Sequence, residues 1–115
     1  MTRVAAIDCG TNTIRLLIAE ADRDDSGRPR LEVLRRRNEI VRLGQGVDRT
    51  GLLDPDALER TLAAVASYAA DCTELGVAPG GDVRRFVATS ATRDARNRED
   101  FVAGVRRLLG IEPEV

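Results

Sequence analysis

The chain has 115 residues, of which 43% are hydrophobic and 32% are charged, a composition typical of one globular domain or of part of a larger one. Its 18 basic and 19 acidic side chains give a net charge of −1, so bulk electrostatics provide no attraction toward nucleic acid or a membrane surface. The sequence contains no histidine, which excludes a histidine general base and a histidine-ligated zinc site within it.

The apolar stretches near the N-terminus are short and flank a polar turn, which is unlike a signal peptide. No stretch has the length needed to cross a bilayer. Cys9 and Cys72 lie far apart without a CxxC pattern, so we expect buried, reduced thiols rather than a zinc or redox motif. These features lead us to expect a cytoplasmic protein with neither nucleic acid nor membrane as a partner.

The segment IDCGTNTIRLL at residues 7–17 carries the strongest functional signal. An apolar run breaks and then resumes, which predicts antiparallel strands over residues 4–9 and 14–21. In the turn, Gly10 would let the backbone approach a ligand, while Thr11, Asn12 and Thr13 would place short polar side chains beside exposed N–H groups, an arrangement that suits a phosphate. Asp8 could then hold a cation against that phosphate. Alternatively, the polar residues only satisfy their own hairpin turn.

A polar loop over residues 22–29 is expected to lead into a third, longer strand over residues 31–43, which alternates imperfectly between apolar and charged side chains. Within it, Arg35-Arg36-Arg37 has two interpretations. The run could attract phosphate, or it could be a solvated strand edge that resists aggregation.

Glycines at positions 44, 46 and 51 mark the exit from this strand, and Asp54-Pro55 is typical of a helix start. Apolar residues then recur at spacings of three and four, which predicts one helical face against a core and a helix end near Gly76. The residues that form this face are Leu58, Leu62, Val65, Ala69 and Cys72.

A fourth strand is predicted over residues 83–89, followed directly by a helix that begins at Ser90. A strand that enters a helix through small hydroxyl residues exposes N–H groups that can bind an anion, and Arg93 would add a permanent charge. The alternative is that Ser90 only caps the helix and Arg93 is a surface residue.

A last helix is predicted to be capped by Asn97, to bury Phe101, Val105 and Leu108 on one stripe, and to end at Gly110. The final five residues, 111–115, are expected to begin a fifth strand. If that strand were incomplete, the bare edge of the fourth strand would favour self-association.

Four ordered motifs together make the sequence closely similar to the N-terminal part of the exopolyphosphatase / guanosine pentaphosphate phosphohydrolase family. They are IDCGTNTIRLLIAE (7–20), IVRLGQGVDRTGLLDPDALERT (40–61), VATSATRDARN (87–97) and GIEPEV (110–115). The resemblance implies an α/β, ribonuclease H-like domain of the superfamily that includes actin, sugar kinases and heat-shock chaperones. Its expected order is β-β-β-α-β-α, cut before the last strand, so that residues 1–115 form the N-terminal part of the first actin-like ATPase-type domain.

For function, the resemblance implies a phosphohydrolase that acts on polyphosphate or on guanosine pentaphosphate with magnesium. Gly10 to Thr13, Ser90 and Arg93 would bind phosphate, and Asp8 would hold the metal indirectly. The family's catalytic glutamate would follow Val115, so Glu112 and Glu114 are not assigned that role and no catalytic residue is expected in this chain. A homodimer is one expected form of the full-length protein. A sugar-kinase-like phosphotransferase and a non-catalytic module that binds polyphosphate or an alarmone such as guanosine tetraphosphate are the competing hypotheses.

Overall fold

The computed structural model describes residues 2–115, which form a four-stranded sheet covered by helices on one face. The strands are β1 (Thr2–Cys9), β2 (Thr13–Arg23), β3 (Pro29–Ile40) and β4 (Arg84–Ala88). The helices are α1 (Val47–Thr50), α2 (Pro55–Glu74), α3 (Ser90–Asp94) and α4 (Arg98–Leu109). The predicted order of three strands, helix, strand and helix is confirmed, the helix expected to begin at Ser90 is the short α3, and α1 is an addition.

The strands lie in the order β3-β2-β1-β4, so the last strand added along the chain joins the sheet beside the first. The hairpins β1–β2 and β2–β3 are antiparallel, whereas β4 runs parallel to β1, with Cys9 opposite Ala88. A parallel pair needs a crossover connection, which α2 provides. As a result, β1 and β4 both end at the same edge of the sheet.

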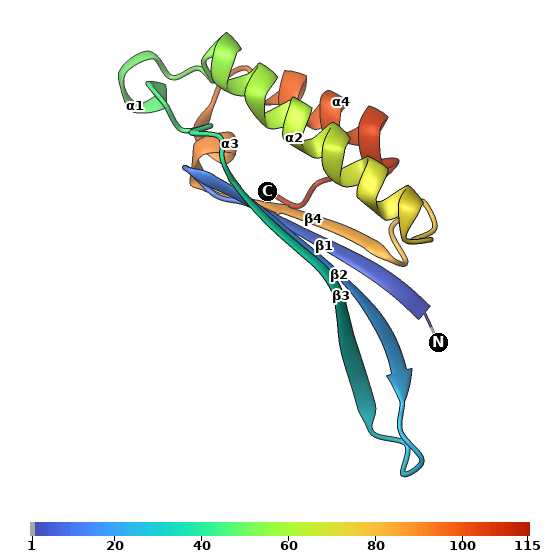
Figure 1. Cartoon of the computed structure of the whole chain (residues 1–115). Helices are drawn as coiled ribbons and strands as arrows, with labels where there is room; N and C mark the ends of the chain where they lie inside the picture. The colour runs from blue at the N-terminus through green and yellow to red at the C-terminus, as the bar shows by residue number, and fades with distance from the viewer. Residues whose placement is uncertain (1) are drawn as a thin grey trace.

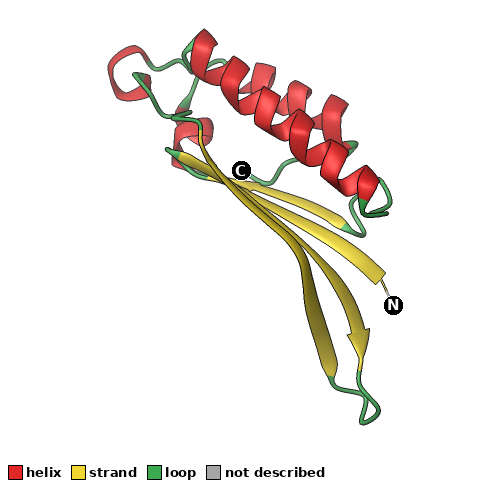
Figure 2. Ribbon diagram, viewed as in Figure 1, coloured by secondary structure: helices red, strands yellow, loops and turns green. Residues whose placement is uncertain are grey.

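The long helices α2 and α4 pack side by side over one face of the sheet, and the opposite face carries no helix (Figures 1 and 2). Strand residues alternate between the two faces, and those facing the helices are buried. Phe86 of β4 and Phe101 of α4 meet edge to face, with 5.8 Å between ring centroids. The hairpin of β2 and β3 extends past the helix-covered body (Figure 1).

Asp54 begins α2 as predicted, because its carboxylate accepts hydrogen bonds from the amide N–H groups of Asp56 and Ala57. Gly76, with a φ of 73°, and Gly110, with a φ of 71°, take the left-handed conformation just beyond α2 and at the end of α4. Both predicted helix ends are therefore confirmed.

Several strand ends and two features of α4 differ from the prediction. Strand β3 ends at Ile40 instead of Leu43, because the amides of Val41 and Arg42 turn away to the carbonyl oxygen of Asn12. Asn97 stands at the start of α4, but its side chain bonds to the backbone of Leu53 and does not cap the helix. The buried stripe of α4 includes Leu109, while Leu108 is half-buried.

The predicted fifth strand is reduced to a single parallel bridge between Val87 and Glu114. The amide of Ala88 donates to the carbonyl of Glu114 at 2.7 Å, and the amide of Glu114 donates to the carbonyl of Phe86 at 2.8 Å. The outer edge of β4 is thus partly paired and is not the bare edge that the sequence led us to expect. Among the helices that the structure describes, none is long and apolar enough to cross a membrane.

Candidate phosphate-binding site

The β1–β2 turn and the start of α3 lie together at the edge where β1 and β4 end. The amide of Thr89, the residue before α3, donates to the carbonyl of Cys9, the last residue of β1, at 3.1 Å. The hydroxyl of Thr89 also donates to this carbonyl, at 3.4 Å. The two segments that the sequence predicted to bind phosphate are therefore neighbours in space, although about eighty positions separate them.

The β1–β2 turn is held by a hydrogen bond within it and by hydrogen bonds from the chain that follows β3. The amide of Gly10 donates to the carbonyl of Thr13 at 2.9 Å, which closes the turn. The carbonyl oxygens of Thr11 and Asn12 accept hydrogen bonds from the chain after β3. Within residues 2–115, no acceptor is recorded for the amides of Thr11 and Asn12, and both residues are exposed. These two N–H groups are thus available to an anion from solution.

The conformation of the turn does not account for the glycine at position 10. Gly10 does not adopt a left-handed φ, so the turn does not need glycine for its conformation. A Cβ atom there would meet only the carbonyl oxygen of Thr13, at 3.6 Å, which is an ordinary contact. The backbone at Gly10 is therefore open on the side of the missing side chain, which is the space that the predicted close approach of a ligand would use.

Arg93 lies in the last turn of α3, and its side chain is 60% exposed. Its nearest recorded carboxylate is that of its neighbour Asp94, at 3.9 Å, which is too long for a strong ion pair. Ser90 is the first residue of α3, but Thr89 occupies the cap position that the sequence suggested for Ser90. Since α3 has only five residues, its dipole offers an anion little, and Arg93 is the main source of positive charge in this segment.

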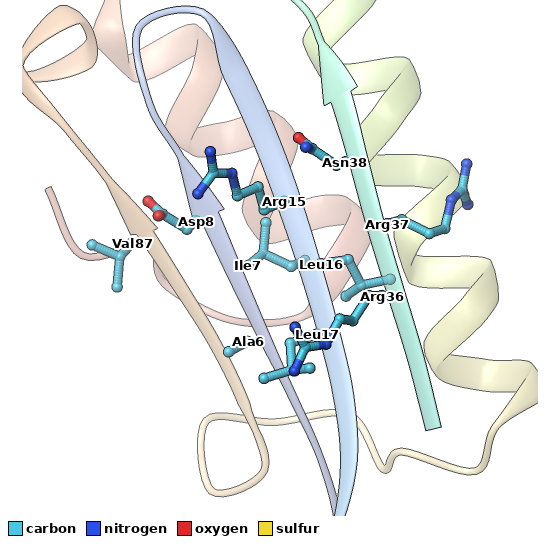
Figure 3. Close-up of a pocket in the computed structure, with 10 residues that line it drawn as sticks. All are labelled: Ala6, Ile7, Asp8, Arg15, Leu16, Leu17, Arg36, Arg37, Asn38 and Val87. Atoms are coloured by element: carbon cyan, nitrogen blue, oxygen red, sulfur yellow. The ribbon is translucent and has the colours of Figure 1, made fainter. Parts of the chain in front are cut away.

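Asp8 and Arg15 face each other across β1 and β2 on the open face of the sheet, close to the turn (Figure 3). They help to line a concave pocket whose floor includes Ala6, Leu17 and Val87. No group of three or more metal-ligating side chains occurs among the described residues, so Asp8 belongs to no such cluster. The sequence interpretation missed Arg15, although strand alternation from Thr13 places its side chain on this face.

The three consecutive arginines divide between the two faces of the sheet. Arg35 and Arg37 point toward α2, where both donate to the carboxylate of Asp71, at 2.7 and 2.6 Å. Arg36 lies between them on the open face and lines the pocket there (Figure 3). Two members of the run are therefore structural, which matches neither of the two interpretations considered for the run as a whole.

Both cysteines are buried and unpaired, as predicted. Burial, with a smaller contribution from the nearby charge of Asp8, raises the pKa of Cys9 to about 12. Burial also raises the pKa of Cys72. Because thiolates are the reactive form, neither thiol is suited to act as a nucleophile or a metal ligand.

Comparison with known sequences gives the relationships of the chain. The sequence model of the Ppx/GppA phosphatase family matches residues 18–115. The chain is 49% identical over 110 residues to exopolyphosphatase 2 of Mycobacterium tuberculosis, covering 96% of this chain and 33% of that protein. It is 36% identical over 101 residues to a bifunctional 3-dehydroquinate synthase/phosphatase of Fusobacterium nucleatum, covering 88% of this chain and 15% of that protein.

Solved structures similar to this chain also include Ppx/GppA proteins. A crystal structure of the Aquifex aeolicus Ppx/GppA family member matches with a TM-score of 0.84 and 35% identity, over 99% of this chain and 34% of that one. An exopolyphosphatase of Cytophaga hutchinsonii matches with a TM-score of 0.82 and 26% identity, over 99% and 34%. The fold is thus the actin-like α/β fold of these proteins, and the chain spans about a third of their length. On sequence and structure together, the chain belongs to the Ppx/GppA phosphatase family.

Proposed function

We propose that this chain forms one wall of a phosphate-binding site in a phosphohydrolase that cleaves terminal phosphoanhydride bonds of polyphosphate or of guanosine pentaphosphate. The observation that carries the proposal is the juxtaposition of the Gly10–Thr13 turn with α3, through the hydrogen bonds of Thr89 to Cys9. The amides of Thr11 and Asn12 and the guanidinium of Arg93 would bind phosphoryl oxygens. Such donors stabilise negative charge that develops during phosphoryl transfer.

Magnesium fits this site if a single carboxylate of the chain is its protein ligand. Mg²⁺ keeps several waters and is commonly bound by one or two carboxylates together with substrate phosphates. Asp8 is exposed at the end of β1 and provides one carboxylate. We therefore assign Asp8 to holding the ion, directly or through water, and the phosphate chain would supply further ligands. The ion would screen the charge of the substrate.

The carboxylates near the C-terminus do not provide a general base. Glu114 accepts two hydrogen bonds from Arg85, at 2.8 and 3.0 Å, and Glu112 accepts two from Arg106, at 2.8 and 2.7 Å. These pairs lower the pKa of both carboxyl groups. A general base contributes about 10²–10⁴-fold to such reactions, so we expect the 115-residue chain alone to release no phosphate from polyphosphate at an appreciable rate.

Binding can be tested separately from turnover. We expect tripolyphosphate with magnesium to shift the amide resonances of Thr11, Asn12 and Arg93 in NMR spectra of the chain. Gly10→Ala should weaken this binding, because the new methyl group would occupy the space that the ligand needs while meeting only an ordinary contact in the protein. Gly81→Ala is the matched control, since a Cβ atom at Gly81 meets nothing within 4 Å.

Resonance shifts confined to other parts of the sheet, or equal affinity of the Gly10→Ala and wild-type chains, would contradict the proposed site. Polyphosphate hydrolysis by the 115-residue chain at the rate of a full-length relative would contradict the assignment of the general base to a segment outside it. A requirement for ATP and a hydroxyl acceptor in the full-length protein would favour the phosphotransferase hypothesis.

A further inference from the structure

The connection between β3 and α2 packs directly against the phosphate-binding turn. The amides of Val41 and Arg42 donate to the carbonyl of Asn12 at 2.8 and 2.9 Å, and the amide of Gly44 donates to the carbonyl of Thr11 at 2.9 Å. These hydrogen bonds occupy the carbonyl groups of Thr11 and Asn12. They leave the N–H groups of the turn facing outward, which is the orientation that an anion needs.

Gly44 is the tightest point of this contact. Its φ is not left-handed, so the backbone does not require glycine for conformational reasons. A Cβ atom at this position would collide with Cγ2 of Thr11, well inside van der Waals distance, and would lie 3.4 Å from both Cβ and the carbonyl oxygen of Thr11. The methyl group of Thr11 thus occupies the space that a side chain at position 44 would need.

The connection is anchored to the body of the protein on both sides of Gly44. Arg60 of α2 donates to the carbonyl of Val41 at 3.1 Å and to the side chain of Gln45 at 3.1 Å. Further along, the carbonyl of Gly51 accepts from the amide of Arg96, just after α3, at 2.9 Å. Because the connection is fixed at both ends, a collision at Gly44 would have to be relieved largely by movement of Thr11.

We propose that Gly44 is a positioning residue for the phosphate-binding turn, acting through the methyl group of Thr11. The inference rests on the proposed function in one respect, namely that the turn binds phosphate. The connection over residues 41–51 holds the turn by its carbonyl groups and also contacts the chain after α3, so it sets the placement of both phosphate-binding segments. A larger residue at position 44 must displace the methyl group of Thr11, and under the proposal the backbone of Thr11, with its amide, moves with it.

The test is a double-mutant cycle that combines Gly44→Ala with Thr11→Ser. Serine keeps the hydroxyl group and removes Cγ2, the atom with which the new methyl group collides. Without ligand, Gly44→Ala should speed hydrogen exchange of the Val41 and Arg42 amides by about tenfold, as expected for a poorly accommodated methyl group. Exchange of the Arg96 amide should not change. In the Thr11→Ser background, Gly44→Ala should change the exchange of Val41 and Arg42 by less than about threefold.

The same four proteins are then titrated with tripolyphosphate and magnesium. Gly44→Ala should weaken binding by about tenfold in the wild-type background and by less than about threefold in the Thr11→Ser background, whatever Thr11→Ser itself costs. Gly81→Ala again serves as the control for a glycine-to-alanine change in open space. Equal effects of Gly44→Ala in the two backgrounds would overturn the proposal, as would unchanged exchange of Val41 and Arg42.

A second variant keeps the proposal testable if Gly44→Ala does not fold. Arg60→Ala removes an exposed side chain that holds the connection by the carbonyl of Val41. It should speed exchange of the Val41 and Arg42 amides and weaken tripolyphosphate binding, and wild-type values for both would overturn the role of the connection. Absence of tripolyphosphate binding by the wild-type chain would contradict the proposed function, whereas the exchange cycle would still decide whether Gly44 positions the turn.

Discussion

Two groups of arginines in this chain differ in their surroundings. Between β3 and α2, Arg35 and Arg37 share the carboxylate of Asp71, and Arg37 also lies 5.0 Å from the ring of Tyr68. At the end of the sheet, Arg93 is largely exposed and has only a distant carboxylate beside it. Arg35 and Arg37 donate hydrogen bonds within the fold, whereas Arg93 has no close carboxylate among the described residues, which leaves its donors for the phosphate of the proposed site.

The difference shows that the number of arginines in a segment says little about anion binding. The side chains of Arg35 and Arg37 are 30% exposed and that of Asp71 is 12% exposed, so water screens these charges only partly. Hydrogen bonds donated to Glu74 and Asp71 raise the pKa of Arg35, which shows that its charged form is favoured where it lies. An anion would have to displace carboxylates already in place, so we do not expect phosphate to bind there.

The largest expected effect comes from Asp71→Asn, which leaves two arginines without their shared carboxylate. Removing one partner of a fully buried pair costs about 3–5 kcal/mol, and we expect about 2–3 kcal/mol here because both arginines are partly exposed. Urea unfolding measures this change in the free energy of unfolding. Glu74→Gln is the control, because the Glu74 side chain is 63% exposed and its pair with Arg35 should contribute much less to stability. Equal costs for the two variants would remove the distinction between the buried and the exposed carboxylate.

Arg93→Ala should weaken phosphate binding and leave the stability of the fold almost unchanged. We expect tripolyphosphate affinity to fall about tenfold, because a hydrogen bond to a charged group contributes about 1.5 kcal/mol, while the free energy of unfolding changes by less than about 0.5 kcal/mol. Calorimetric titration and urea unfolding on the same sample measure the two quantities. A loss of stability without a loss of affinity would place Arg93 with the structural arginines.

The pH dependence of stability should reveal the ion pairs that Arg35 and Arg37 form with Asp71. Burial raises the pKa of Asp71, but hydrogen bonds from Arg37 and Arg35 outweigh burial, and the pKa lies below the ordinary value of 3.8. The unfolded state therefore binds a proton at higher pH than the folded state does. The contribution of Asp71 is fully present above pH 3.8 and is lost as the pH falls through the lower, folded pKa.

The measurement is the difference in the free energy of unfolding between the wild-type and Asp71→Asn chains across a pH series. This difference should be constant at neutral pH and shrink below pH 3.8. A carboxylate with a lowered pKa that lies away from Asp71, such as that of Glu112 beside Arg106, is present in both proteins and cancels. A difference that stays constant down to the acid limit would show that the ion pairs do not carry the stabilisation.

Local signals in the sequence predicted the elements that local physics determines. The break in the apolar run at Gly10, the Asp54-Pro55 helix start and Gly110 each depend on nearby residues, and each was found where expected. Helix α1 was missed because it has only four residues between two glycines in the left-handed conformation. A segment that short carries no hydrophobic periodicity.

Contacts between distant residues could not be predicted. The shared carboxylate of Asp71 lies 34 positions from Arg37, and the side chain of Asn97 bonds to Leu53, 44 positions away. The collision that a Cβ atom at Gly44 would make with Thr11 likewise depends on the tertiary arrangement. The sequence therefore indicated which segments make up the candidate site, but not which contacts hold these segments in place.

The smallest effect is expected for Arg36→Ala. This variant is compared with Arg37→Ala, because the two arginines are neighbours in β3 and differ in which face of the sheet they occupy. Arg37→Ala should cost about 1–2 kcal/mol, since it removes hydrogen bonds to Asp71, Ser67 and Glu39. Arg36→Ala should change the free energy of unfolding by less than about 0.5 kcal/mol, because Arg36 is exposed on the open face and no ion pair is recorded for it among the described residues. Its register partner is Leu17, four residues beyond the turn at Thr13, so Arg36→Ala should also alter tripolyphosphate affinity by less than about twofold. If Arg36→Ala lowered the affinity by more than this, the anion site would extend along the open face of the sheet. If Arg36→Ala lowered the stability by more than this, exposure of the side chain would not distinguish structural arginines from unpaired ones.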